Sequence, residues 1–149
     1  MTPNITEFLD GTGTDHKGRF ITDIWHFDDR EIEHNHDFIQ WLFPLNEPSM
    51  SVFGAPVLDQ SDIDTIFSSD VARTNVIKSS DWYLGFLKRN EHWIKSYDHN
   101  HLRITRTIKS LRLLVGNNEA DQFRKNLLLI LGDKINTIKL SALKFWNSA

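Results

Sequence analysis

The sequence predicts an all-α fold, a single compact domain of about six helices around an aromatic-rich core. Apolar residues recur at helical spacing, and no alternation with a period of two residues is sustained. Residues that favour helix N-caps precede the apolar runs, and glycine follows several of them. Ten Phe and five Trp among 149 residues supply large side chains for a core.

Composition sets the first limits on function. The length is that of one ordinary domain, expected over 1–149, and the absence of cysteine excludes disulfides, thiolate metal sites and cysteine nucleophiles. Seventeen basic against 20 acidic residues give a net charge of −3, which argues against nucleic acid as a partner. No apolar run reaches the roughly 18 residues of a transmembrane helix. The N-terminus lacks a secretory pattern, so a cytoplasmic location is expected.

The first part of the chain predicts no regular structure, and residues 1–20 are expected to form an irregular N-terminal segment. Within it, the stretch DGTGTDHKG at 10–18 has no apolar residue and is typical of a loop. Its glycines do not make a phosphate-binding loop, because no strand precedes them and no Gly-Lys-Ser/Thr follows.

A long helix is predicted over about 29–43. Asp28, with Glu31 three residues later, has the spacing of a capping box, in which two side chains satisfy the first free backbone N–H groups. Pro44 marks the expected end, because proline has no backbone N–H and its ring clashes with the preceding turn.

The later helices follow from the same signals. They are expected over 60–67 with Asp59 as cap, over 71–89 with Ser69 or Asp70 as cap, over 101–115 with Asn100 as cap, from about 118 to Gly132, and over 134–146. Two connections, 46–58 and 90–99, are expected to be irregular but anchored by apolar side chains. These anchors are Val52 and Phe53 in the first connection, and Trp93 and Tyr97 in the second.

The helix predicted over 29–43 carries a narrow polar strip. Glu33, His36 and Gln40 fall within about 60° of one another, while apolar residues fill an arc of about 200° opposite them. This arc is wider than that of an ordinary surface helix, so the strip should border buried surface. Three interpretations stay open: a solvent-facing edge with a structural hydrogen-bond network, a ligand site, or a metal site.

The metal interpretation starts from Glu33-x-x-His36, the spacing found in ferritin-like di-iron bundles. Such centres need a second copy of this unit, which the sequence lacks. The two His-x-His pairs, at 34–36 and 99–101, place their rings on different sides of a helix. We therefore expect neither a metal ion nor another cofactor.

The helix expected over 101–115 is basic on one side. Ile104, Ile108, Leu111 and Val115 define an apolar face, whereas Arg103, Arg106, Lys109 and Arg112 spread over the other half. Charged faces are usually solvated. Alternatively, Arg103 or Arg106 turns toward Glu33, because a guanidinium can hold a carboxylate with two hydrogen bonds.

Two long segments resemble a known family. IEHNHDFIQWLFPLNEPS at 32–49 and HNHLRITRTIKSLRLL at 99–114 are similar to the two signatures of the opioid growth factor receptor conserved domain. Weaker matches extend the resemblance from Phe8 to Trp146, and the chain resembles the short, stand-alone form that occurs in bacteria. The positions that match the polar residues of the signatures are Glu33, His36, Gln40, His99, Asn100, Arg103 and Arg106.

The resemblance implies a receptor-type helical domain, because vertebrate members bind an enkephalin-type peptide and associate with the nucleus and nuclear membrane. We therefore expect a peptide or a small acidic ligand to bind between 29–43 and 101–115, where Glu33 could hold an amine and Arg106 a carboxylate. Trp25, Trp41 and Phe43 are expected to supply aromatic walls. The expected ligand-binding residues are Glu33, His36, Gln40, Trp41, Asn100, Arg103 and Arg106.

Two other functions stay open. An enzyme could use His36 as a general base. No serine or metal constellation accompanies it, so a binding domain is expected instead. The basic face over 103–112 could bind phosphate or nucleic acid, and steep salt dependence would reveal this. The oligomeric state does not follow from the sequence.

Overall fold

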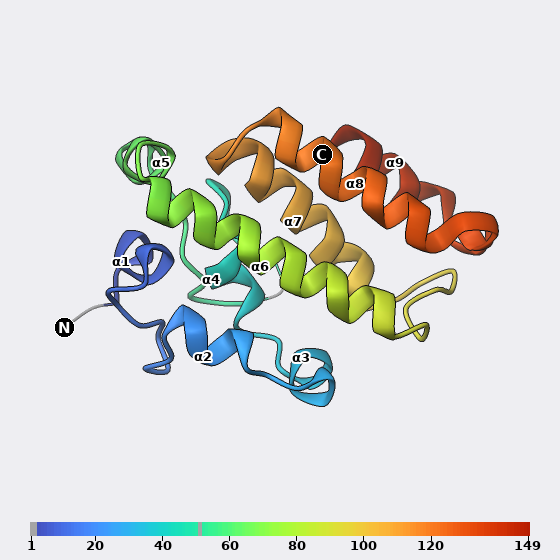
Figure 1. The fold of residues 1–149 in the computed structure, drawn as a ribbon, viewed down its shortest axis with the longest axis horizontal. Helices are drawn as coiled ribbons and strands as arrows, with labels where there is room; N and C mark the ends of the chain where they lie inside the picture. The colour runs from blue at the N-terminus through green and yellow to red at the C-terminus, as the bar shows by residue number, and fades with distance from the viewer. Residues whose placement is uncertain (1–2, 51) are drawn as a thin grey trace.

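The computed structural model describes residues 3–50 and 52–149, and its helical architecture confirms the all-α prediction (Figure 1). Within these residues, the one β-type pairing is an isolated bridge between Leu45 and Val57. The elements in chain order are α1 (Ile5–Asp10), α2 (Ile21–Trp25), α3 (Asp29–His34), α4 (Ile39–Leu42), α5 (Gln60–Phe67), α6 (Asp70–Arg89), α7 (His99–Leu114), α8 (Asn117–Leu131), the 3-10 helix η1 (Gly132–Thr137) and α9 (Leu140–Ser148).

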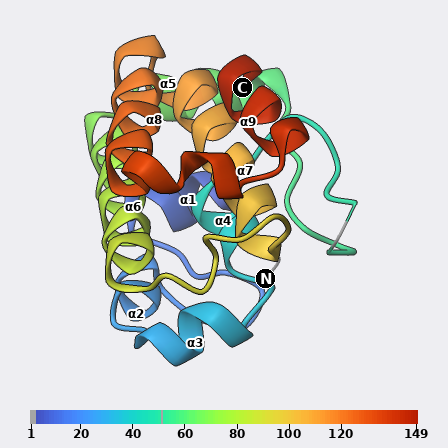
Figure 2. The same ribbon diagram turned by 90° about the vertical axis from the view of Figure 1, so that its right-hand side faces the viewer.

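Three long helices, α6, α7 and α8, form the centre of the domain, and each packs against the other two. The last helix, α9, lies on α7, while α1 packs against α6, α5 and α4. Figures 1 and 2 show the short helices α1 to α4 gathered on one side of the long helices. The chain between α4 and α5 extends as a long loop at the edge of the molecule (Figure 2).

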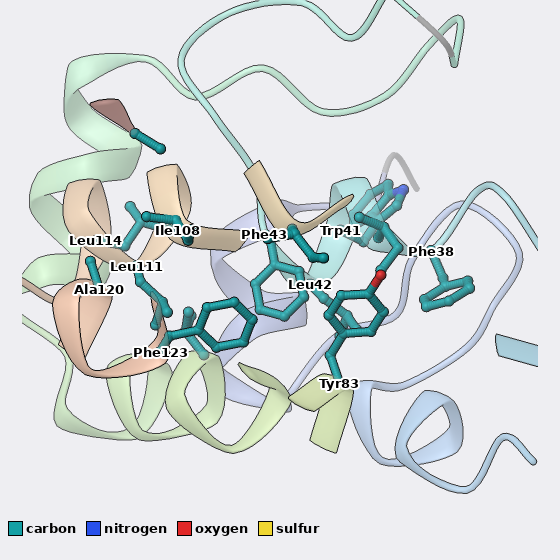
Figure 3. Close-up of a cluster of buried hydrophobic side chains, with 14 of the residues drawn as sticks. Phe38, Trp41, Leu42, Phe43, Tyr83, Ile108, Leu111, Leu114, Ala120 and Phe123 are labelled. Carbon is teal, nitrogen blue, oxygen red and sulfur yellow. The ribbon is translucent and has the colours of Figure 1, made fainter. Parts of the chain in front are cut away.

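The core is aromatic, as predicted, and joins the short helices to the long ones. Figure 3 shows side chains from α4, α6, α7 and α8 converging, with Phe43 among them. Two further tryptophans, Trp93 and Trp146, are also buried. Trp93 donates from Nε1 to the carbonyls of Leu87 and Asn90, and Trp146 donates from Nε1 to the carbonyl of His101. These bonds let the indole rings be buried with their N–H groups satisfied.

Local capping signals predicted the starts of several helices correctly. Asp28 Oδ1 accepts from the N–H of Glu31 at 2.8 Å, and Glu31 Oε1 accepts from the N–H of Asp28 at 3.1 Å. Asp59 caps α5 in the same way, and Ser69 caps α6. Gly132 closes α8 at a φ of +50°, a conformation that side chains disfavour.

The predicted helix over 29–43 is wrong in one respect, because the chain leaves the helical path between α3 and α4. Arg103 of α7 donates from Nη1 to the carbonyl of Ile32 at 2.8 Å and from Nη2 to that of Asn35 at 2.6 Å. A guanidinium thus replaces backbone N–H groups as the partner of the last α3 carbonyls. Asp37, inside the break, is held by Lys17 at 2.5 Å and by Arg19 at 3.2 Å.

Other differences lie at helix ends and in connections. The irregular segment expected over 1–20 contains α1, capped by the side chain of Asn4, and α2 was also not predicted. Asp98, not Asn100, caps α7. The last expected helix, over 134–146, divides into η1 and α9. The predicted anchors Phe53 and Tyr97 are exposed.

Candidate functional site

A pocket of about 470 Å³ lies between α7 on one side and α4 with the following connection on the other. Its apolar walls include Ile39, Leu45 and Leu102. Four of the seven predicted site residues line it: His36, Gln40, Arg103 and Arg106. The other three, Glu33, Trp41 and Asn100, do not line this pocket.

Arg103 is the most firmly held of the pocket residues. Its side chain is buried, its guanidinium holds the α3 carbonyls, and the guanidinium carbon lies 5.4 Å from the ring centroid of Phe38. A planar cation bonded at its edges and packed on an aromatic face is well stabilised without a ligand. Arg103 therefore acts as a structural clamp that also borders the pocket.

Glu33 does not pair with a guanidinium, so this part of the site hypothesis is wrong. Its Oε1 accepts from Nδ2 of Asn100 at 2.9 Å. His92 Nε2 lies 2.6 Å from Oε2, and His99 Nε2 lies 3.0 Å from Oε1, as ion-pair contacts when the rings are protonated. No local pattern identified His92 in advance, because it comes from the connection after α6.

The surroundings of Glu33 favour its ionised form. Burial by itself raises the pKa of the carboxyl, but the hydrogen bond from Asn100 and the charges of His99 and His92 outweigh it, so the net pKa is lowered. A lowered pKa in the folded state means that the folded protein holds the proton less tightly than the unfolded chain does. The stabilisation is therefore present above the ordinary pKa and is lost as the pH falls through the lowered one.

Glu33→Gln should accordingly change how stability depends on pH. We expect the wild type to exceed the variant in free energy of unfolding at pH 7, with the difference shrinking as the pH falls below about 4.5. Urea unfolding followed by circular dichroism at pH 7, 5 and 3.5 measures this. Asp81→Asn, on an exposed position of α6, is the control. A difference between wild type and Glu33→Gln that stays constant over this range would contradict the prediction.

Asn100 is a buried junction of hydrogen bonds. It is 0% exposed, its Oδ1 accepts from the hydroxyl of Tyr83 at 2.7 Å, and its Nδ2 donates to Glu33 and to Asp98. Burial of the phenol raises the pKa of Tyr83, so the hydroxyl stays neutral and donates. Asn100 therefore joins α6, α7 and α3, a structural task that keeps it away from the pocket.

The predicted aromatic walls lie elsewhere. Trp41 packs its ring on His16 at 5.8 Å between centroids and meets the edge of Phe8 at 5.4 Å. Phe43 is buried in the core, and Trp25 donates from Nε1 to Ser79. The aliphatic side chains around the pocket take their place as its apolar surface.

Three buried polar atoms on the pocket residues form no hydrogen bond within the described part of the chain. One is His99 Nε2, which lies 3.0 Å from Glu33 Oε1, and the other two are on Gln40 and Arg106. Gln40 is 8% exposed, and its Oε1 is buried without a hydrogen bond. Arg106 donates from Nε to the carbonyl of Phe43 at 2.8 Å, but its buried Nη2 has no acceptor. Burial lowers the pKa of Arg106 to about 10, partly offset by Glu47, which leaves the guanidinium charged at neutral pH.

His36 is the remaining titratable residue among the predicted ligand-binding residues. Its pKa is lowered, first by burial and then by the positive charges of Arg103 and His99, with Glu33 acting in the opposite direction. Its ring meets the His99 ring edge to face, with centroids 5.4 Å apart. No hydrogen bond from a described residue orients the His36 ring, and residues 3–50 and 52–149 contain no cluster of three or more His, Asp or Glu suited to a metal ion.

The basic side of α7 is largely used for internal contacts. Arg103 holds the α3 carbonyls, and Lys109 lies 3.3 Å from Glu47. Arg112 donates to the carbonyl of Ala149 and to the side chains of Asn117 and Asp121.

No helix in the described part of the chain is long and apolar enough to cross a membrane.

Comparison with known proteins places the chain in a family. The model of the opioid growth factor receptor (OGFr) conserved region matches residues 12–91. The chain is 32% identical over 115 residues to the opioid growth factor receptor of Rattus norvegicus, a match that covers 63% of this chain and 20% of the relative. The human receptor is 30% identical over 131 residues, with 74% and 19% covered.

Relatives of a second name match over more of the chain. Opioid growth factor receptor-like protein 1 of Xenopus tropicalis is 32% identical over 146 residues, a match that covers 85% of this chain and 28% of the relative. The chain thus spans less than a third of the length of these curated relatives. No solved structure matches. Since the conserved-region model covers more than half of the residues, the chain belongs to the opioid growth factor receptor family.

Proposed function

We propose that this chain is a ligand-binding domain that takes a peptide or a small acidic ligand in the pocket between α4 and α7. One observation carries the proposal: Gln40 and Arg106 line this pocket, and Gln40 Oε1 and Arg106 Nη2 are buried without partners in the described residues. Buried polar groups nearly always have hydrogen-bond partners, and an exception calls for a missing group. A bound ligand would supply it.

The size and walls of the pocket support a small ligand. Its volume of about 470 Å³ falls within the range of roughly 300–1,000 Å³ that is usual for such sites. Aliphatic side chains with a few convergent polar groups are the usual lining of ligand pockets. The relatives are named opioid growth factor receptor. For this reason the proposal for this chain includes a peptide among the possible ligands.

Binding is favoured over catalysis for this pocket. A general base is normally oriented by a second group, as in hydrolase triads. His36 contacts the ring of His99, and no described residue offers it a hydrogen bond. Two members of the basic face, Arg103 and Arg112, hold protein groups, which leaves less of it for phosphate or nucleic acid.

Filling the pocket tests the proposal. Leu102 is 57% exposed and lines the pocket, so Leu102→Trp should block the space without disturbing the core. The probe is an enkephalin-type pentapeptide with free termini, titrated by NMR into ¹⁵N-labelled protein. We expect shift changes around Gln40 and Thr105 in the wild type and at least tenfold weaker binding in Leu102→Trp.

Leu129→Trp is the matched control, because Leu129 is 73% exposed on α8 and borders a different pocket. It should bind the pentapeptide as the wild type does. Peptide-induced shifts that avoid the residues lining the pocket, or equal affinity in Leu102→Trp and wild type, would overturn the proposed site.

A further inference from the structure

We infer that the pocket contains an anion subsite at Arg106, and that it takes the carboxylate end of an acylated amino acid, such as the C-terminus of a peptide. This inference rests on the proposed function and adds the chemistry of the ligand. It follows from the charges around the pocket, from the way Arg106 is held, and from the unpaired acceptor on Gln40.

The fixed charges that line the pocket are mostly positive. Arg103, Arg106 and Lys109 contribute cations, and Glu47 is the acidic residue among the lining residues described. Glu47 lies 3.3 Å from Lys109, and Arg103 is bonded to backbone carbonyls. Neither Arg103 nor Arg106 has a carboxylate in contact, and of the two Arg106 has an Nη group without an acceptor among the described residues, in a pocket whose charges favour an anion.

The guanidinium of Arg106 is held in place before any ligand arrives. Its Nε donates to the carbonyl of Phe43 at 2.8 Å, where α4 ends, which fixes one side of the group. The buried Nη2 has no acceptor among the described residues. A guanidinium fork matches carboxylate and phosphate oxygens with two parallel bonds, so an anion would complete its hydrogen bonding.

The side chain of Gln40 helps to distinguish a carboxylate ligand from phosphate. Its unpaired Oε1 accepts hydrogen bonds, so the ligand should also present a donor, an N–H or an O–H. Gln40 and Phe43, whose carbonyl holds Arg106, lie three residues apart in α4 and its C-cap, and Gln40 and Arg106 both line the pocket. A phosphate ion carries no N–H, and the O–H that it can donate is on the same phosphorus atom as the oxygens that would bind Arg106. The end of a peptide offers a carboxylate and, on the same residue, an amide N–H.

His36 gives the inference a second readout. Burial, Arg103, His99 and His34 lower the pKa of His36, and Glu33 raises it only in part, so the ring is neutral at pH 7.5. A bound anion in the same pocket stabilises the protonated ring. Binding should then take up a proton, and affinity for the anion should increase as the pH falls from 7.5 to 6.

The experiment compares three probes on the intact chain by NMR and calorimetric titration. They are N-acetyl-leucine, the uncharged N-acetyl-leucinamide, and inorganic phosphate. The variants are Arg106→Gln, Arg106→Lys and the control Lys125→Gln, which removes the charge of an exposed lysine on α8, outside the pocket. Circular dichroism and thermal unfolding check that each variant folds.

We expect N-acetyl-leucine to bind at least tenfold more tightly than its amide and than phosphate. Arg106→Gln should lose at least tenfold of this affinity, Arg106→Lys should keep part of it, and Lys125→Gln should change it less than threefold. If Arg106→Gln does not fold, the comparison of acid with amide and the Arg106→Lys variant still decide the question.

Three results would overturn the inference. These are equal binding of acid and amide, undiminished binding in a folded Arg106 variant, and phosphate binding as tight as that of N-acetyl-leucine. If shifts at the pocket persist in these cases, the proposed function stands and only the anion subsite fails. If neither the acids nor the pentapeptide shifts any pocket residue, the proposed function itself fails.

Discussion

Replacing Arg103 with methionine is expected to lower the free energy of unfolding by about 3–5 kcal/mol, the largest single effect that we predict. The substitution keeps most of the aliphatic volume but removes the donors to the carbonyls of Ile32 and Asn35, at 2.8 and 2.6 Å. Both acceptors lie at the end of α3, where the helix supplies no N–H of its own. The contact with the face of Phe38 is lost as well.

Urea unfolding of the wild type and the Arg103→Met variant measures this effect, with Arg30→Met as control. Arg30 is an exposed arginine on α3, and its replacement should cost less than about 0.5 kcal/mol. Arg103→Lys should fall between them, because an ammonium cannot reproduce the spacing of the guanidinium fork. A loss below about 1 kcal/mol for Arg103→Met would show that the α3 carbonyls find other partners.

Asn100→Ala is expected to lower the free energy of unfolding by about 2–4 kcal/mol. The substitution leaves the buried hydroxyl of Tyr83 without its acceptor and removes the amide donor to Glu33. It also frees Asp98 Oδ1 from one of its two bonds to Asn100, although the backbone N–H of that residue still donates to it. Removing one partner from a buried network costs more than removing both.

A double-mutant cycle with Tyr83→Phe tests this explanation. In the Tyr83→Phe background there is no buried hydroxyl left to satisfy, so Asn100→Ala should cost about 1–2 kcal/mol less than in the wild type. Thermal and urea unfolding of the four proteins give the coupling energy. Purely additive effects would mean that the Tyr83–Asn100 bond at 2.7 Å does not contribute in solution.

Helix starts were the most predictable part of the fold, because their signals are local. In the capping boxes at Asp28 and Asp59, the partner lies three residues along the chain, so both partners can be identified from a short stretch of sequence. The cap of α7 was misplaced by two residues, since Asp98 and Asn100 are both good capping residues. Only the packing of Asn100 against Tyr83 and Glu33 decided between them.

The break between α3 and α4 could not be predicted in this way. The apolar pattern over 38–43 fits a continued helix as well as a new one, and the partners that stabilise the break lie far away in sequence. Arg103 is 71 residues from Ile32. Asp37 forms ion pairs with Lys17 and Arg19, which lie in an earlier loop. The polar strip derived for one continuous helix therefore does not exist as such.

Partners that are distant in sequence also explain why only some of the predicted site residues line the pocket. His36, Gln40, Arg103 and Arg106 do line one pocket, in agreement with the expectation that the two segments meet. Glu33 and Asn100 turn instead into a network with His92 and His99, and Trp41 packs on His16. The residue types suited either role, and only their three-dimensional neighbours distinguish a structural partner from a pocket lining.

The sequence by itself determined the helical class, the aromatic core, several helix caps and the family, because these depend on spacing, on local backbone chemistry and on long motifs. The tertiary structure decided which polar groups are satisfied within the protein. Arg103 and Arg106 come from one turn of one helix, yet the first has both Nη groups bonded and the second has a buried Nη2 without a partner in the described residues. Hydrogen bonding in a folded chain depends on what packs against each side chain, and that information lies in distant segments.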